Sequence, residues 1–124
     1  QPASEDLIIT GVSGAEAVKT LMQRRPDVTA IFAIHDENAV SAMQGLTELG
    51  LKMPQDVSIV GLDDSATPAV ELPGLTTVSF HHSKVGQLAA KLLLEQIDSD
   101  NNFYSKVFLR CHLIERESCA PPRG

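Results

Sequence analysis

The chain has 124 residues, and its 10 Lys and Arg against 16 Asp and Glu give a formal net charge of −6 at pH 7. Fractions of 43% hydrophobic and 21% charged residues are typical of one soluble globular domain and exclude a disordered tail. No apolar run has the roughly 18 to 20 residues of a membrane span, the first residues lack a signal-peptide pattern, and the acidic balance indicates that this segment does not bind DNA by itself.

The first half of the chain predicts two helices and a strand, after a short apolar run at residues 7–9. A capping box that begins at Ser13 starts the first helix. Residues 29–34 are apolar throughout, which is the pattern of a parallel strand covered on both faces. Asp36 is expected to cap the second helix, and Gly50 ends it because glycine readily adopts a left-handed conformation.

The second half of the chain predicts more strands and one long helix. Residues 57–62 and 75–79 are short apolar runs typical of buried strands, and residues 85–97 form an amphipathic helical pattern. Residues 106–110 and 113–117 are predicted as two further strands. Because strands alternate with helices, we expect an α/β fold with a parallel sheet and right-handed crossovers.

Candidate ligand-binding residues follow the predicted strands at their carboxyl ends. Ligands of open parallel sheets bind there, because loop side chains and helix N-termini converge at that edge. Imidazole and carboxylate groups can bond to hydroxyl groups while an aromatic ring stacks on a sugar or base, which suits a small polyhydroxylated ligand. A purely structural role stays open for each residue, since the aspartates could cap helices or turns and the phenylalanine could fill the core. The residues at this edge are Ile9, Thr10, His35, Asp36, Asp63, Asp64, Phe80, His81 and His82.

Hydrolytic and metal chemistry match the sequence poorly. Ser13 lies in a segment close to the G-x-S-x-G pattern of hydrolases, but the second glycine is missing, and a helix cap explains this serine better. His81 and His82 are neighbours whose side chains point apart, and no histidine pair has helical spacing for a metal. Cys111 and Cys119 fit no zinc or redox motif, so we expect reduced thiols.

Nucleotide and phosphoryl chemistry are not expected either. The chain has neither a G-x-G-x-x-G loop nor a Walker lysine. Phosphoacceptor receiver domains have a similar size and an aspartate after the third strand, where Asp63 falls. However, Ile9 and Thr10 occupy the place of the acidic pair that receivers carry after their first strand. We therefore expect no enzyme, no cofactor and no metal site.

Four segments of the chain carry a family likeness in their order and spacing. They are residues 29–36 (TAIFAIHD), residues 45–64 with the pattern G-L-x-x-P-x-D-V-S-I-V-G-x-D-D, residues 75–78 (LTTV) and residues 116–118 (RES). These segments closely resemble the C-terminal part of the LacI/GalR family of bacterial transcription regulators. The likeness covers most of the chain, from about residue 7 to residue 122.

The resemblance implies an effector-binding domain of the periplasmic-binding-protein type, in which two α/β lobes are hinged around a ligand. Residues 1–124 would be the partial domain, made of the C-terminal lobe and a crossover helix over residues 83–98. The N-terminal lobe and the helix-turn-helix head would be absent. The apolar stripe of the crossover helix would then be covered by non-native packing or by a second chain.

The resemblance also implies roles for particular residues. The effector contacts of the family fall on Ile9, His35, Asp63 and Phe80, where Asp63 would hold ligand hydroxyl groups. His35, Phe80 and Ile9 differ from the residues that are usual in the family at these positions, so the identity of the effector stays open. The dimer contacts of the family fall on Val40 and on residues 69–72, which here include Ala69, Val70 and Leu72.

The function implied by the resemblance is a cytoplasmic regulator without enzymatic activity. A small sugar or nucleoside-like effector would shift the equilibrium between two lobe arrangements, and a homodimer would pass this change to operator DNA through the missing N-terminal head. Two alternatives share the fold. One is a solute-binding protein of a transport system, and the other is the same effector domain joined to a winged-helix head.

Overall fold

The fold is an α/β arrangement of seven elements. A computed structural model describes residues 8–65, 72–98 and 105–122. The elements, in chain order, are α1 (Gly14–Arg24), β1 (Ala30–Phe32), α2 (Asp36–Glu48), β2 (Ser58–Leu62), β3 (Thr76–Ser79), α3 (His82–Asp98) and β4 (His112–Ile114).

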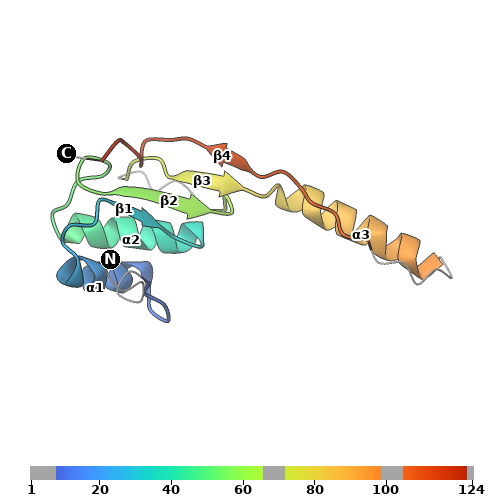
Figure 1. Cartoon of the computed structure of the whole chain (residues 1–124), viewed down its shortest axis with the longest axis horizontal. Coiled ribbons are helices and arrows are strands. Elements are labelled where there is room, and N and C mark those ends of the chain that lie inside the picture. Colours follow the sequence, from blue (N-terminus) through green and yellow to red (C-terminus); the bar gives the residue numbers. More distant parts are fainter. Residues whose placement is uncertain (1–7, 66–71, 99–104, 123–124) are drawn as a thin grey trace.

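The four strands form one sheet in the order β1-β2-β3-β4. β1, β2 and β3 are parallel, with Ile31 opposite Ile59 and Val60 opposite Thr76. β4 is antiparallel to β3, with Ser79 opposite His112. The predicted α/β class with a mainly parallel sheet is confirmed, and the carboxyl ends of β1, β2 and β3 lie at one edge of the sheet (Figure 1).

Two helices cover one side of the sheet in successive layers. α2 packs on the strands and α1 packs on the outer side of α2 (Figure 1). The side chains between these layers are small or aliphatic, so the two helices and the sheet approach closely and share one core. The buried core residues are Val18, Ala39, Ala42, Met43, Leu46, Val57, Ile59 and Leu75.

The helix ends are partly as predicted. Ser13 caps α1 through a capping box, because its Oγ accepts from the Glu16 N–H at 3.3 Å and its own N–H donates to the Glu16 carboxylate. Gly50 has a left-handed φ of 75° just after α2, as expected. The prediction that Asp36 caps α2 is wrong, because the N-cap residue is His35 and no side-chain cap bond is present there.

Two predicted strands differ from the structure, and the first apolar run is not a strand in its described part. Residues 8–9 form no strand, and residues 106–110 are extended but pair with no other strand among the described residues. A strand needs a hydrogen-bonded neighbour, and β3, the neighbour of β4, ends opposite His112. The strand predicted at 113–117 is only His112–Ile114, because the chain after Ile114 turns towards β2.

α3 projects from the sheet, and of the described residues only the extended chain that leads into β4 runs along it (Figure 1). None of its residues is buried, and the side chain of Ile97 is 69% exposed. The amphipathic helix predicted over residues 85–97 is therefore present, but within the described part of the chain its apolar stripe is only partly covered, at the half-buried Leu88 and Leu92. The large apolar side chains that are exposed on α3 are Val85, Leu93, Leu94 and Ile97.

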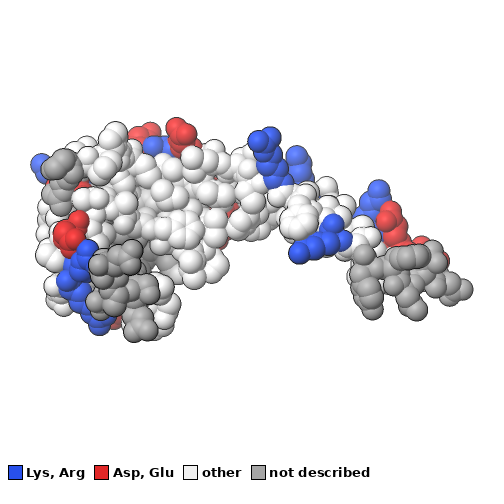
Figure 2. Space-filling view, viewed as in Figure 1, with Lys and Arg blue, Asp and Glu red and all other residues white. Residues whose placement is uncertain are grey.

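The sheet also leaves apolar surface uncovered. In β1, Ala30 and Phe32 are exposed while Ile31 is half-buried, so the expectation that this strand is covered on both faces is wrong within the described residues. Ile34 is exposed as well. Figure 2 shows few charged side chains over the part of the surface formed by the sheet and α2. None of the described helices is both long enough and apolar enough to cross a membrane.

The uncovered face of α3 predicts self-association of the 124-residue chain. Sedimentation velocity should detect dimers or larger species, because exposed apolar patches of this kind drive association. A double variant, Leu94→Glu with Ile97→Glu, should shift the chain towards the monomer. A matched control, Gln87→Glu with Gln96→Glu, adds the same charge to α3 without removing apolar side chains. A wild-type chain that sediments as a monomer at every concentration would contradict this prediction.

Candidate functional site

The turn after β2 carries two adjacent carboxylates in an unusual backbone conformation. Asp63 has φ 108° and Asp64 has φ 56°, which is the left-handed region that residues with a Cβ rarely adopt. The Asp63 N–H continues the sheet by donating to Val78 O at 2.8 Å. Its Oδ1 accepts from the Ser65 N–H at 3.0 Å, a local bond that aspartate commonly makes in turns. The surrounding bonds therefore hold a strained turn at the carboxyl edge of the sheet.

Asp63 and His35 come together at this edge, from the ends of β2 and β1. His35 Nδ1 lies 3.4 Å from Asp63 Oδ2, and the side chains are 62% and 16% exposed respectively. Partial burial raises the pKa of the Asp63 carboxyl group, but hydrogen bonds from Ser65 and His35 outweigh it, so the pKa lies below its usual value. Asp63 is therefore an ionised hydrogen-bond acceptor at neutral pH, and His35 is an exposed neighbour that can also bond to a ligand.

Aromatic rings extend this pair towards the start of α3. His82 Nε2 lies 2.9 Å from Asp63 O, and the His82 ring meets the Phe80 ring edge to face, with 5.8 Å between centroids. The ring of His81 contacts that of His112 in β4 with 4.7 Å between centroids. All four histidines of the chain thus lie near this edge of the sheet, together with one aromatic ring.

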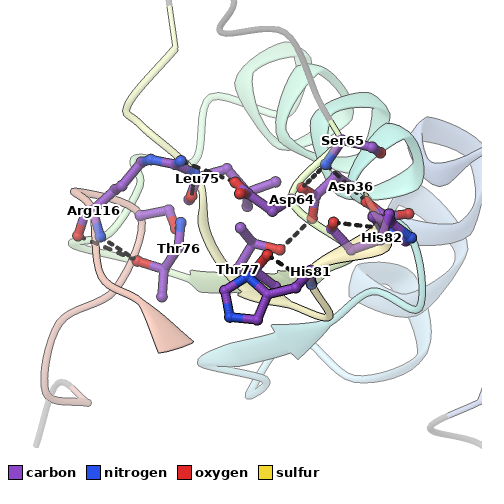
Figure 3. Close-up of polar contacts among 12 residues, drawn as sticks. Asp36, Asp64, Ser65, Leu75, Thr76, Thr77, His81, His82 and Arg116 are labelled. Carbon is purple, nitrogen blue, oxygen red and sulfur yellow. Dashed lines mark hydrogen bonds and ion pairs between the residues drawn. The ribbon is translucent and has the colours of Figure 1, made fainter. Parts of the chain in front are cut away.

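Asp36 has a different place from the one predicted. Its side chain is 1% exposed and lies between Ser65 and Thr77 (Figure 3). Thr77 Oγ1 donates to its Oδ1 at 2.6 Å, and the Ser65 N–H donates to its Oδ2 at 3.1 Å. Gly61 in β2 leaves the space for this carboxylate, because a Cβ at Gly61 would lie 2.1 Å from Asp36 Oδ1. Asp36 therefore joins α2 to β3 and to the turn, and it does not face solvent.

Asp64, the second carboxylate of the turn, bonds to Arg116. Arg116 Nη2 lies 3.1 Å from Asp64 Oδ1, and its Nη1 donates to Leu75 O at 2.7 Å (Figure 3). The main chain of Arg116 also bonds to Thr76 Oγ1. This geometry thus supports a structural role for Asp64, which pairs with Arg116.

Ser118 closes the opposite end of the sheet. Its Oγ accepts from the Thr76 N–H at 2.8 Å and donates to Ile59 O at 2.6 Å, and the residue is fully buried. Its main chain bonds to Ile59 N and to Gly74 O. Arg116 and Ser118, two of the residues in the RES segment, are therefore structural. Periodicity could not identify these roles, because the partners lie about 40 to 60 positions away in the sequence.

The other predicted site residues either form no hydrogen bond with Asp63 or His35 in the described part of the chain or lie outside the described residues. The ring of Phe80 contacts the ring of His82, which in turn lies 2.9 Å from Asp63 O. Ile9 is half-buried ahead of α1 and shares no hydrogen bond with the other predicted contact residues among those described. Val40 and Leu72, predicted at the dimer interface, are half-buried against the core. Ala69 and Val70, predicted there too, lie outside the described residues.

In the described part of the chain, no three His, Cys, Asp or Glu side chains are grouped so that they could hold a metal ion. The edge of the sheet therefore offers a carboxylate acceptor, imidazole groups that can donate or accept, and an aromatic ring. These groups can bind hydroxyl groups and a sugar or base face. The arrangement supports binding and offers no activated nucleophile.

Comparison with known proteins matches this geometry to one fold family. Residues 2–119 match the family model described as the periplasmic binding protein-like domain. The HTH-type transcriptional regulator MalR of Clostridium butyricum is 37% identical over 119 residues, which are 93% of this chain and 35% of MalR. The chain spans about a third of the length of the curated relatives it matches.

Two of the similar solved structures are also transcriptional regulators. A LacI family transcriptional regulator from Enterococcus faecalis V583, with bound ribose, has a TM-score of 0.78 and 36% identity, and the match covers 94% of this chain and 44% of that one. A complex of the transcriptional regulator CelR with cellobiose has a TM-score of 0.77 and 35% identity, and the match covers 85% of this chain and 32% of that one.

Proposed function

This chain belongs to the periplasmic-binding-protein-like domain family, and from that membership we propose that it is the effector-sensing part of a LacI-type transcriptional regulator. The observation that carries the proposal is the Asp63 carboxylate, which is held at the carboxyl edge of the sheet beside His35. The transport-protein alternative shares the fold, but the matched relatives named above are regulators.

The proposed ligand is a small sugar or nucleoside-like molecule. Asp63 would accept hydrogen bonds from ligand hydroxyl groups, because its carboxylate is ionised and partly open to solvent. His35 would add a second polar contact, and Phe80 would offer a ring face for stacking. Ile9 would complete the contact set. The sugars in two of the similar structures, ribose and cellobiose, support this ligand class.

We propose that residues 1–124 are one partial domain of a longer regulator. The remaining two thirds would supply a second lobe and a DNA-binding head, and the second lobe would cover the apolar face of α3. The net charge of −6 fits a module that reaches operator DNA only through that head. Val40, Ala69, Val70 and Leu72 are proposed to contact a second copy in a cytoplasmic homodimer.

The mechanism that we propose is a shift between two lobe arrangements. An effector that binds one arrangement more tightly increases its population, by no more than its difference in affinity for the two. The dimer would pass this change to the spacing of the two DNA-binding heads. The chain would perform no chemistry on its ligand.

Asp63→Asn tests the site. Asparagine keeps the size of the side chain and tolerates the left-handed backbone, so the fold should persist while the charge is lost. We expect affinity to fall at least about tenfold, the typical effect of removing a hydrogen bond to a charged group. Isothermal titration calorimetry of the regulator that contains this chain, with ribose, cellobiose and adenosine as probes, measures the change.

The matched control is Asp64→Asn, since Asp64 bonds to Arg116 and we do not place it against the ligand. This variant should bind within about threefold of the wild-type protein. An Asp63→Asn protein with unchanged affinity for a probe that binds the wild-type protein would exclude Asp63 as the ligand-binding carboxylate.

A further inference from the structure

One backbone N–H connects two carboxylates at the candidate site. The Ser65 N–H lies 3.0 Å from Asp63 Oδ1 and 3.1 Å from Asp36 Oδ2. Asp63 is partly open to solvent, whereas Asp36 is buried. Ser65 is only two residues after Asp63, so a group that fixes Ser65 also restricts the backbone of the turn. The buried carboxylate therefore acts on the exposed one through the turn.

Both carboxylate oxygens of Asp36 are held by hydrogen bonds. Its Oδ1 accepts from Thr77 Oγ1 in the middle of the sheet, and the same oxygen lies against Gly61. Asp36 is also in the first turn of α2, where the N-terminal end of a helix favours a negative charge. Because a buried polar group needs hydrogen-bond partners, the Asp36 side chain has little freedom to move. Asp36 is therefore a fixed hydrogen-bond acceptor for the Ser65 N–H.

The hydrogen bond from Ser65 to Asp36 matters because the turn at Asp63 and Asp64 has a strained backbone. Asp63 and Asp64 both have left-handed φ values, and such residues persist only when neighbouring contacts hold them. Asp36 also follows His35 directly, so one carboxylate is linked to both polar groups of the candidate site. The Ser65 N–H that Asp36 accepts also bonds to Asp63, whose other carboxylate oxygen lies 3.4 Å from His35 Nδ1.

We propose that Asp36 is a positioning residue for effector binding. It touches no ligand, and it holds the Ser65 N–H so that Asp63 keeps its left-handed backbone and presents its carboxylate at the sheet edge. This inference rests on the proposed function, because it assumes that Asp63 binds the effector. The competing explanation is that Asp36 only joins α2 to β3 through Thr77.

The test compares substitutions that separate the two hydrogen bonds of Asp36. Asp36→Ala removes both bonds. Asp36→Asn keeps an acceptor for the Ser65 N–H, while its amide can donate to the Thr77 hydroxyl group. Thr77→Val removes only the bond to β3 and leaves the bond to Ser65 in place. If Asp36→Ala does not fold, Asp36→Ser replaces it, because one hydroxyl oxygen cannot serve both donors in their present positions.

The first readout needs no ligand. The three-bond coupling between the amide and α protons of Asp63, measured by NMR, is small at its present φ and large in extended backbone. We expect this coupling to rise in Asp36→Ala or Asp36→Ser and to keep its wild-type value in Asp36→Asn and Thr77→Val. A loss of stability in Thr77→Val without a change in the coupling would separate positioning from simple support of the fold.

The second readout is affinity for the sugar or nucleoside probe that binds the wild-type regulator. Asp36→Ala should bind at least about tenfold more weakly, and Asp36→Asn should restore binding to within about threefold. An unchanged coupling in Asp36→Ala, or an equal change in Thr77→Val, would overturn the inference. If Asp63→Asn weakens binding but Asp36→Ala does not, this inference fails alone. If Asp63→Asn binds normally, the proposed function fails and this inference fails with it.

Discussion

Gly61→Ala is expected to lower the free energy of unfolding by about 3 kcal/mol, from overpacking and the disturbed hydrogen bonds of a buried carboxylate. The new Cβ would lie 2.1 Å from Asp36 Oδ1 and 3.0 Å from Leu75 Cδ2, so Asp36 must move. Asp36 cannot move without stretching its 2.6 Å bond to Thr77. The strand, the helix and the turn that meet at Asp36 should therefore be destabilised together.

Urea unfolding followed by circular dichroism measures this effect. The matched control is Gly86→Ala in α3, where a Cβ meets nothing within 4 Å. That variant should be neutral or stabilised by up to about 1 kcal/mol, since alanine favours helix over glycine. Equal stability of Gly61→Ala and the wild-type protein would mean that Asp36 does not lie against β2 in solution.

Ser118→Ala is the second substitution with a large expected effect, a loss of about 2 kcal/mol in the free energy of unfolding. The serine hydroxyl group satisfies two buried backbone groups at once, the Thr76 N–H and the Ile59 carbonyl. Alanine leaves the Thr76 N–H without this acceptor, whereas the Ile59 carbonyl keeps the Cys119 thiol as a donor at 3.2 Å. One unsatisfied buried group costs about 1 to 3 kcal/mol. The small loss of volume adds little to this cost.

Thermal and urea unfolding of Ser118→Ala can be compared with Ser83→Ala, because Ser83 is an exposed serine in the first turn of α3. The control should change stability by less than about 0.5 kcal/mol. Amide hydrogen exchange gives a second measurement, since the Thr76 N–H should lose protection selectively in Ser118→Ala. Protection of Thr76 that equals the wild-type value would contradict the hydrogen bond to Ser118.

The alternation of apolar strands with amphipathic helices was enough to predict the fold class. The helices and the three parallel strands depend on periodicity and end signals within the sequence, such as Ser13 and Gly50. Residues 106–110 have the composition of a strand but no neighbour to pair with in the described chain. Strand composition predicts an extended backbone, whereas a sheet also requires a partner, which a local pattern cannot supply.

The candidate site was predictable in part for a similar reason. The rule that ligands bind at the carboxyl ends of parallel strands included His35 and Asp63 among its candidates, and the structure brings these two side chains together. The same rule could not separate Asp36 from its neighbours, because its burial depends on Gly61 and Thr77 in two other strands. Capping statistics favoured a local role for Asp36, and tertiary contacts determined a different one.

The attachment of α3 has a mechanical consequence. The chain leaves the sheet for α3 after Ser79 and returns to it at His112, and these two residues are opposite each other on adjacent strands. A helix connected to a sheet through a single strand could rotate about that strand. Two connections through adjacent strands, as α3 has through β3 and β4, resist such twisting. The motion of α3 relative to the sheet that meets the least resistance is then bending out of the plane of β3 and β4. The rings of His81 and His112 are in contact next to this connection, so bending there would change the packing of one ring against the other.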